Sequence, residues 1–198
     1  MSLWIAPFPL VLASGSATRQ RLLTGAGLVF ETAPPDVDER AVTAPAPEAL
    51  ARALARAKAL EVSARKPGAL VIGADQVLSL DGRLLHKSRD RAAALATLAQ
   101  LQGRTHRLTS AFALARGARI VAEGAEAADM TMRALDQAAL GLYLDAAGAE
   151  ALGSVGVYQF EGLGAHLFAH VEGDHSTILG LPMLKLLAAL RALGALAF

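Results

Sequence analysis

The sequence has no cysteine, few aromatic residues and no long uncharged apolar run, and each absence narrows what the protein can be. Without cysteine, disulfides and thiolate metal sites are excluded. Aromatic residues make up only 5% of the chain, and much of its 54% hydrophobic content is alanine, which favours a helix-rich α/β domain. The most apolar stretch, 177–198, is interrupted by Lys185 and Arg191, so it is too short to span a bilayer as a helix. We therefore expect a globular protein with no membrane partner.

Charge and short motifs exclude further classes. The formal net charge is +1, which gives no broad electrostatic basis for binding a nucleic acid polymer, so any basic site must be local. The first eighteen residues contain no Lys or Arg, which predicts no secretory signal and a cytoplasmic location. The sequence has no Walker lysine motif, no nucleophile elbow and no Rossmann glycine fingerprint, which argues against those three enzyme classes.

The 198 residues suit a single domain, because no repeat, low-complexity tract or proline-rich linker divides them. Strands are predicted at 10–13, 29–33, 69–72, 77–80, 83–85, 108–114, 119–122, 129–133 and 165–171. Helices are predicted at 17–24, 47–65, 90–101 and 136–147, with a last one beginning near Pro182. This mixture favours an α/β fold with a mixed sheet flanked by helices.

The first strand leads into a candidate anion-binding loop. Ser14, Gly15 and Ser16 precede a helix with Arg19 in its first turn, so hydroxyls, free amides and a guanidinium can converge on one phosphate. The alternative is an ordinary strand-to-helix turn in which Ser16 is the N-cap and Arg19 is solvated.

Two lysines are candidate cations for the same ligand. Lys58 shares a helical stripe with Leu50 and Leu54, which face the core, so a lysine there either extends past the core to water or reaches into a cleft to meet an anionic ligand. Lys87 follows the predicted Asp81-Gly82 hairpin and has the same two alternatives.

Carboxylates are the candidate metal ligands and bases. Asp75 is predicted just past the end of the buried strand 69–72, where open α/β sheets place ligands, although a capping Asp is the alternative. Asp36, Asp38 and Glu39 supply oxygen ligands of the kind that Mg²⁺ and Mn²⁺ prefer, but an acidic loop is also commonly solvated. His166 and His170 are four residues apart in a predicted strand, which disfavours a helical zinc site.

Ordered motifs over nearly the whole chain resemble the landmarks of the Maf family. They are Leu12-Ala13-Ser14-Gly15-Ser16-Ala17-Thr18-Arg19, Asp36-Val37-Asp38-Glu39, Gly73-Ala74-Asp75-Gln76-Val77, Gly103-Arg104-Thr105-His106, Glu161-Gly162-Leu163-Gly164, Glu172-Gly173-Asp174 and Gly180-Leu181-Pro182-Met183. The resemblance implies an elongated mixed sheet with two lobes around a central cleft, and a homodimer. It also implies hydrolysis of a nucleoside triphosphate to the monophosphate and pyrophosphate, with a divalent cation such as Mg²⁺, Mn²⁺ or Co²⁺.

The same resemblance implies roles for individual residues. It places Ser14, Ser16 and Arg19 in the phosphate-binding loop, and Glu39 and Asp75 near metal and water. It makes Lys58 and Lys87 cations that face the phosphates. The residues it implies as catalytic are Asp75, Glu39 and Lys87. Asp75 is either the general base or a metal ligand. Gln76 and Glu161 are expected to contact substrate, since Glu161 stands where many members carry a glutamine that helps to choose the base.

Departures from the usual motifs bear on the substrate. The sequences Asp75-Gln76-Val77 and Glu161-Gly162 resemble the branch that acts on 7-methyl-GTP, and a carboxylate at Glu161 favours the positive charge that N7-methylation gives the base. Gln20, His86 and Ser88 also depart from the common pattern, which leaves a second hypothesis, a nucleotide-binding regulator of septum formation with little hydrolysis. A purely structural interaction domain leaves Lys58 and Asp75 without a role.

Overall fold

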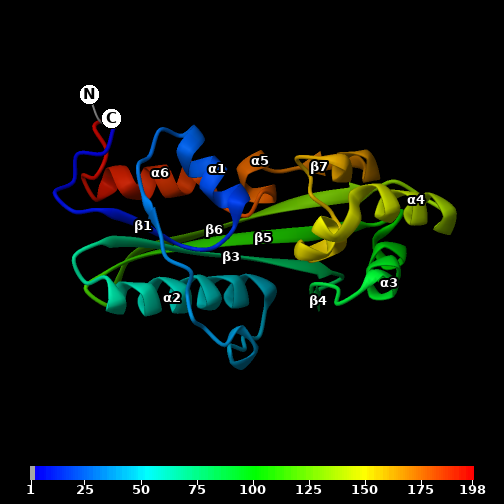
Figure 1. The fold of residues 1–198 in the computed structure, drawn as a ribbon, viewed down its shortest axis with the longest axis horizontal. Coiled ribbons are helices and arrows are strands. Elements are labelled where there is room, and N and C mark those ends of the chain that lie inside the picture. The colour runs from blue at the N-terminus through cyan, green and yellow to red at the C-terminus, as the bar shows by residue number, and fades with distance from the viewer. Residues whose placement is uncertain (1–2) are drawn as a thin grey trace.

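A computed structural model describes residues 3–198 as an elongated seven-stranded mixed sheet with helices on both faces (Figure 1). The strands are β1 (Leu10–Ala13), β2 (Glu31–Thr32), β3 (Leu70–Leu80), β4 (Arg83–Leu85), β5 (Thr105–Arg116), β6 (Arg119–Met132) and β7 (Phe168–Glu172). The helices are α1 (Ala17–Gly25), α2 (Pro47–Arg65), α3 (Arg91–Leu101), α4 (Gln137–Ala147), α5 (His175–Ile178) and α6 (Met183–Ala192). The predicted α/β class and mixed sheet are confirmed. No helix within 3–198 is long and apolar enough to cross a membrane.

The sheet has the strand order β2-β1-β3-β5-β6-β7, and β4 pairs with β3. Strands β1, β2 and β3 are parallel, whereas β5, β6 and β7 continue the sheet in antiparallel pairs. Helix α2 lies along one face, and α1, α5 and α6 lie on the other, with α3 and α4 at one end (Figure 1).

Strand β1 is buried on both faces because its side chains alternate between two hydrophobic clusters. Leu10 and Leu12 pack with α1 and α6, whereas Val11 and Ala13 pack with Val62 of α2. The strand predicted from the short apolar run 10–13 is therefore confirmed.

Helix α2 approaches β3 closely at Gly73. A Cβ atom at that position would lie 2.2 Å from the carbonyl oxygen of Ala55 and 2.5 Å from the amide nitrogen of Ala59, so only glycine allows this packing. Side chains two residues apart on a strand share a face, so Asp75 also faces α2. This close approach brings the turn of α2 that carries Lys58 against Asp75.

The prediction that Asp75 follows the end of its strand is wrong. Asp75 lies in the middle of β3, because β5 pairs with β3 continuously from Val71 to Ser79 and its hydrogen bonds keep the strand extended. The predicted hairpin is present: Asp81 and Gly82 both have positive φ, as a two-residue turn of the type I′ class requires.

Other boundaries also differ from the prediction: the strands predicted at 69–72 and 77–80 are one strand, β3, and β5 is longer at both ends than the predicted 108–114. The run 29–33 yields only the two-residue β2, and the separate strands predicted at 119–122 and 129–133 are one strand, because β5 pairs along nearly the whole of β6. The strand predicted at 165–171 begins only at Phe168. The preceding residues Leu163–Leu167 form a 3₁₀ helix. It follows a tight turn, in which the amides of Gly162 and Gly164 both donate to the carbonyl oxygen of Gln159.

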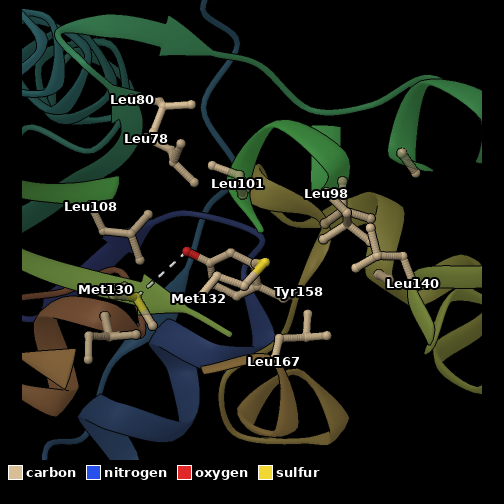
Figure 2. Close-up of a cluster of buried hydrophobic side chains, with 14 of the residues drawn as sticks. Leu78, Leu80, Leu98, Leu101, Leu108, Met130, Met132, Leu140, Tyr158 and Leu167 are labelled. Carbon is tan, nitrogen blue, oxygen red and sulfur yellow. Dashed lines mark hydrogen bonds between the residues drawn. The ribbon is translucent and has the colours of Figure 1, made fainter. Parts of the chain in front are cut away.

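Another hydrophobic cluster fills the end of the molecule that carries α3 and α4 (Figure 2). It contains a buried polar pair, in which Nε2 of His106 lies 2.6 Å from the hydroxyl of Tyr158. The Tyr158 hydroxyl also points to the sulfur of Met130, 3.6 Å away (Figure 2). Phe168 packs against both rings. The molecule thus has a separate core on either side of the middle of β3.

Candidate functional site

The strand pairing of β3 is interrupted on one edge, and the candidate site lies at this interruption. Strand β1 pairs with β3 only as far as Gly73, and β4 begins to pair only at Leu78. Because β5 occupies the other edge, residues 74–77 have no strand neighbour on the side of β1 and β4. Helices α1 and α2 lie on opposite faces of the sheet (Figure 1). Beyond the last residue of β1 no strand within residues 3–198 separates them, so their side chains can approach one another.

The predicted residues Lys58, Asp75 and Glu39 meet here. The ammonium nitrogen of Lys58 lies 2.5 Å from Oδ1 of Asp75 and 2.7 Å from Oε1 of Glu39. The side chains of Lys58 and Asp75 are only 9% and 10% exposed, whereas Glu39, in the 3₁₀ helix Glu39–Ala41, is 57% exposed. Lys58 therefore does not extend to water but pairs with two carboxylates of the protein, and its contact with an anionic ligand stays a prediction.

Asp75 has the electrostatic environment of a base. Burial raises the pKa of its carboxyl above the usual value, and the ammonium of Lys58 opposes this shift. Arg19 also lowers the pKa of Asp75, and Glu39 raises it. A carboxylate with increased proton affinity, held beside cations, is suited to accept a proton from water.

The loop after β1 is organised around Arg19. Ser16 caps α1 by accepting from the amide of Arg19 at 3.4 Å, and Oγ of Ser14 accepts from the amide of Ser16 at 3.2 Å and from Nη1 of Arg19 at 3.3 Å. Nε of Arg19 donates to the carbonyl oxygen of Gly180 at 2.9 Å. The predicted N-cap at Ser16 is therefore confirmed, whereas Arg19 is held by protein groups and not solvated; phosphate binding by this loop stays a prediction.

Arg19 belongs electrostatically to the same site as Asp75. Burial lowers the pKa of its guanidinium, and the negative charges of Asp75 and Glu39 raise it. A guanidinium remains protonated in proteins, so Arg19 supplies a fixed positive charge. The site therefore combines two carboxylates with two cations.

Gln76 faces the opposite side of the sheet from Asp75. Its amide nitrogen donates to Oγ of Ser110 at 3.1 Å and to the carbonyl oxygens of Thr177 and Ile178 at 3.1 and 2.9 Å. Gln76 thereby fixes the segment that leads to Gly180, which in turn accepts from Arg19. The sequence alone did not identify Ser110 and Thr177, since neither lies in a motif. Substrate contact by Gln76 stays a prediction.

Glu161 contacts helix α1. Its Oε1 accepts from the hydroxyl of Thr18 at 2.8 Å and from Nη2 of Arg21 at 3.0 Å, and Arg21 also donates to Thr18 at 3.1 Å. The side chain of Arg21 is 64% exposed and that of Glu161 28%. These contacts connect α1, which follows the loop of Ser14 to Ser16, to a segment 140 residues further along the chain.

The remaining predicted residues lie outside this group of contacts. Lys87 is exposed, and within residues 3–198 it makes no hydrogen bond or ion pair. Asp38 caps the 3₁₀ helix by accepting from the amide of Arg40, while the amide of Asp36 donates to Glu61. The acidic loop thus contributes only Glu39 to the contacts around Lys58.

Asp75 and Glu39 are the candidate ligands for a divalent cation. Asp75 and Glu39 offer two hard carboxylate ligands that converge on one point, the Lys58 ammonium. The part of the chain that the structure describes holds no group of three or more His, Cys, Asp or Glu side chains placed to bind a metal, and this includes His166 and His170. Two carboxylates fit a cation that takes its other ligands from water and from phosphate oxygens, as Mg²⁺ commonly does.

Comparison with known proteins decides the family. The family described as Maf-like protein matches residues 9–193. The chain belongs to the Maf-like family. The resemblance inferred from its motifs is thereby confirmed.

Three similar members of the Maf-like family carry two different names. A nucleoside triphosphate pyrophosphatase of Nitrobacter winogradskyi is 54% identical, with 97% of each chain covered. A 7-methyl-GTP pyrophosphatase of Mesorhizobium japonicum is 51% identical over 94% of this chain and 97% of its own. Another 7-methyl-GTP pyrophosphatase, of Brucella abortus, is 50% identical over 92% of this chain and 94% of its own. These names agree on pyrophosphatase activity and differ on the nucleotide.

Proposed function

We propose that this protein is a nucleoside triphosphate pyrophosphatase that hydrolyses the bond between the α and β phosphates. The observation that supports it best is the buried contact of Lys58 with Asp75 and Glu39, beside the phosphate loop that holds Arg19. The names of the similar relatives support the same activity.

In the proposed reaction Asp75 accepts a proton from the attacking water. Burial raises the pKa of this carboxyl, which increases its capacity as a base, and no covalent nucleophile is required. Lys58 and Arg19 balance the negative charge that develops on the phosphoryl oxygens. The amides at the start of α1 and the hydroxyls of Ser14 and Ser16 hold the triphosphate. Lys87 is proposed to reach the leaving pyrophosphate.

Asp75 and Glu39 would hold a divalent cation. When bound, such a cation supplies charge neutralisation at the phosphoryl oxygens and polarises water. If Asp75 is a ligand rather than the base, its carboxylate still orients the reacting groups. Mg²⁺, Mn²⁺ and Co²⁺ are the candidates.

The proposed substrate is 7-methyl-GTP, with Glu161 beside the base. One oxygen of Glu161 is bound to Thr18 and Arg21, and within residues 3–198 the other oxygen makes no hydrogen bond, so it remains available to a ligand. A carboxylate favours a cationic methylated base over a neutral one. A homodimer and a cytoplasmic location remain predictions.

The deciding experiment is a nucleotide panel that includes GTP, 7-methyl-GTP, UTP and dTTP, with each of the three cations. Pyrophosphate and orthophosphate are measured separately, because only cleavage between the α and β phosphates releases pyrophosphate. We expect pyrophosphate, with the highest rate on 7-methyl-GTP. Tight nucleotide binding without product would support the regulator of septum formation instead, and orthophosphate as the first product would contradict the proposed bond.

A further inference from the structure

The ammonium of Lys58 occupies the point at which the two candidate metal ligands converge. Its nitrogen lies 2.5 Å from Oδ1 of Asp75 and 2.7 Å from Oε1 of Glu39. These are the two carboxylates with which a divalent cation would be held. A cation that binds there has to displace an ammonium that is already paired with both of them.

The charges of the site give a free divalent cation little attraction. Asp75 and Glu39 carry two negative charges, and Lys58 and Arg19 carry two positive charges, so the four side chains sum to zero. Burial lowers the pKa of the Arg19 guanidinium, and the negative charges of Asp75 and Glu39 oppose this shift, so Arg19 belongs in this count. The affinity of oxygen-ligand sites depends on the number of charged ligands, and here the ligand charge is already balanced.

The ligand number leads to the same conclusion. Nowhere in 3–198 do three or more His, Cys, Asp or Glu side chains gather closely enough to hold a metal. Hard cations such as Mg²⁺ and Mn²⁺ require about six oxygen ligands, and in sites with one or two carboxylates phosphate oxygens supply several of them. A triphosphate would provide these oxygens, and its negative charge would engage both Lys58 and Arg19.

We propose that Lys58 keeps the two carboxylates closed to a divalent cation until a nucleotide arrives, so that cation and nucleotide bind together. The triphosphate draws the ammonium away from Asp75 and Glu39 and brings oxygen ligands for the cation. This inference rests on the proposed function, because it takes the phosphates to lie beside Lys58. Lys58 is then both a phosphate contact and the group that prevents the free protein from holding a cation.

Binding of Mn²⁺ to the full chain without nucleotide tests the inference directly. Free Mn²⁺ is followed by electron paramagnetic resonance in the unchanged protein, in Lys58→Met and in Lys66→Met. Lys66 is the matched control, because it caps the same helix, and its loss also frees a carboxylate, that of Glu31 at 2.7 Å, on an exposed surface. We expect Lys58→Met to bind one Mn²⁺ at least about tenfold more tightly than the unchanged protein, since two carboxylates are then uncompensated by a neighbouring ammonium. Lys66→Met should resemble the unchanged protein.

A second measurement needs no variant, so it holds even if Lys58→Met does not fold, which circular dichroism would reveal. The unchanged protein is titrated with α,β-methylene GTP, which cannot be cleaved at the proposed bond, with and without Mn²⁺. We expect Mn²⁺ to raise the affinity for the analogue at least about tenfold, which is a coupling of roughly 1.4 kcal/mol.

Two results would overturn the inference. One is a free protein that binds Mn²⁺ within twofold of the Lys58→Met affinity. The other is an analogue affinity that does not respond to Mn²⁺. Failure of the proposed function is a separate outcome, since it is read from the nucleotide panel: no pyrophosphate released while Mn²⁺ and the analogue still bind together would contradict the enzyme but not the coupled binding.

Discussion

The protein has two buried polar pairs, one at the middle of β3 and one in the core beside α3 and α4, and they differ in charge and in their surroundings. Lys58 and Asp75 are charged, and they lie where β3 lacks a strand neighbour on one edge. His106 and Tyr158 lie in the other core, enclosed by aromatic rings. Burial lowers the pKa of His106 to about 4, so its imidazole is neutral at pH 7.

The comparison shows that burial of polar groups does not by itself mark a functional site. His106 lies in β5 opposite Met130 of β6 and is buried, and Nδ1 of its ring has no hydrogen-bond partner in the described part of the chain. Packing holds this pair, and no ligand can reach it without opening the core. The Lys58–Asp75 pair combines burial with opposite charges and an interrupted strand edge, and this combination points to chemistry.

The largest expected effect is at Asp75. Asp75→Asn keeps the size of the side chain but removes the proton acceptor, so turnover should fall by about 10²–10⁴. Steady-state pyrophosphate release at saturating nucleotide measures it, with thermal unfolding to show that the fold is kept. Asp129→Asn is the control, because it removes a carboxylate from an exposed pair with Arg107. Near-normal turnover in Asp75→Asn would remove this carboxylate from the mechanism.

The next effect concerns stability and separates the second pair from the first. His106 has a pKa of about 4 in the folded protein and an ordinary value of 6.5 when unfolded, so the unfolded state binds the proton more readily. The free energy of unfolding should therefore fall as the pH drops through the interval from about 6.5 to about 4, by up to roughly 3 kcal/mol from this residue. Urea unfolding at several pH values measures the loss.

His106→Gln isolates this contribution from that of the acidic residues. The variant should be less stable at pH 7, where the fit to Tyr158 is lost, but its stability should depend less on pH over the same interval. Turnover per folded molecule should change little at pH 7. If the two proteins lost stability in parallel on acidification, the low pKa of His106 would be contradicted.

The sequence predicted the elements and part of the site for identifiable reasons. Helix 47–65 was predicted with both ends correct, and Lys58 was identified because a lysine on an apolar stripe requires a partner. The place of Asp75 in its strand could not be read locally, since the length of β3 is set by pairing with β5, where Ala111 lies opposite Asp75. The partners of Gln76 and Glu161 are 34 to 143 residues distant, and no periodic pattern connects them.

Glu161 provides an intermediate case, because its cluster is charged like the first pair but exposed. If its carboxylate faces the base, Glu161→Gln should reduce the preference for 7-methyl-GTP over GTP by about fivefold to tenfold, since a charge interaction in water is worth on the order of 1 kcal/mol. The ratio of kcat/KM for the two nucleotides measures it. Glu48→Gln, which breaks the exposed pair with Arg52, should leave the ratio unchanged. An unchanged ratio in Glu161→Gln itself would exclude this residue from base selection.

The smallest effect is expected at Arg21, whose exposed pair with Glu161 should contribute less than about 1 kcal/mol to stability. Arg21→Gln removes the cation that competes with a methylated base for the same carboxylate, so the preference for 7-methyl-GTP should rise about twofold to threefold. In a protein that already carries Glu161→Gln the same change should have no effect on the ratio, because the charge on which Arg21 acts is gone. A large loss of turnover in Arg21→Gln would instead indicate that Arg21, like Arg19, holds the phosphates. The active site would then extend from the buried charged pair to the exposed first turns of α1.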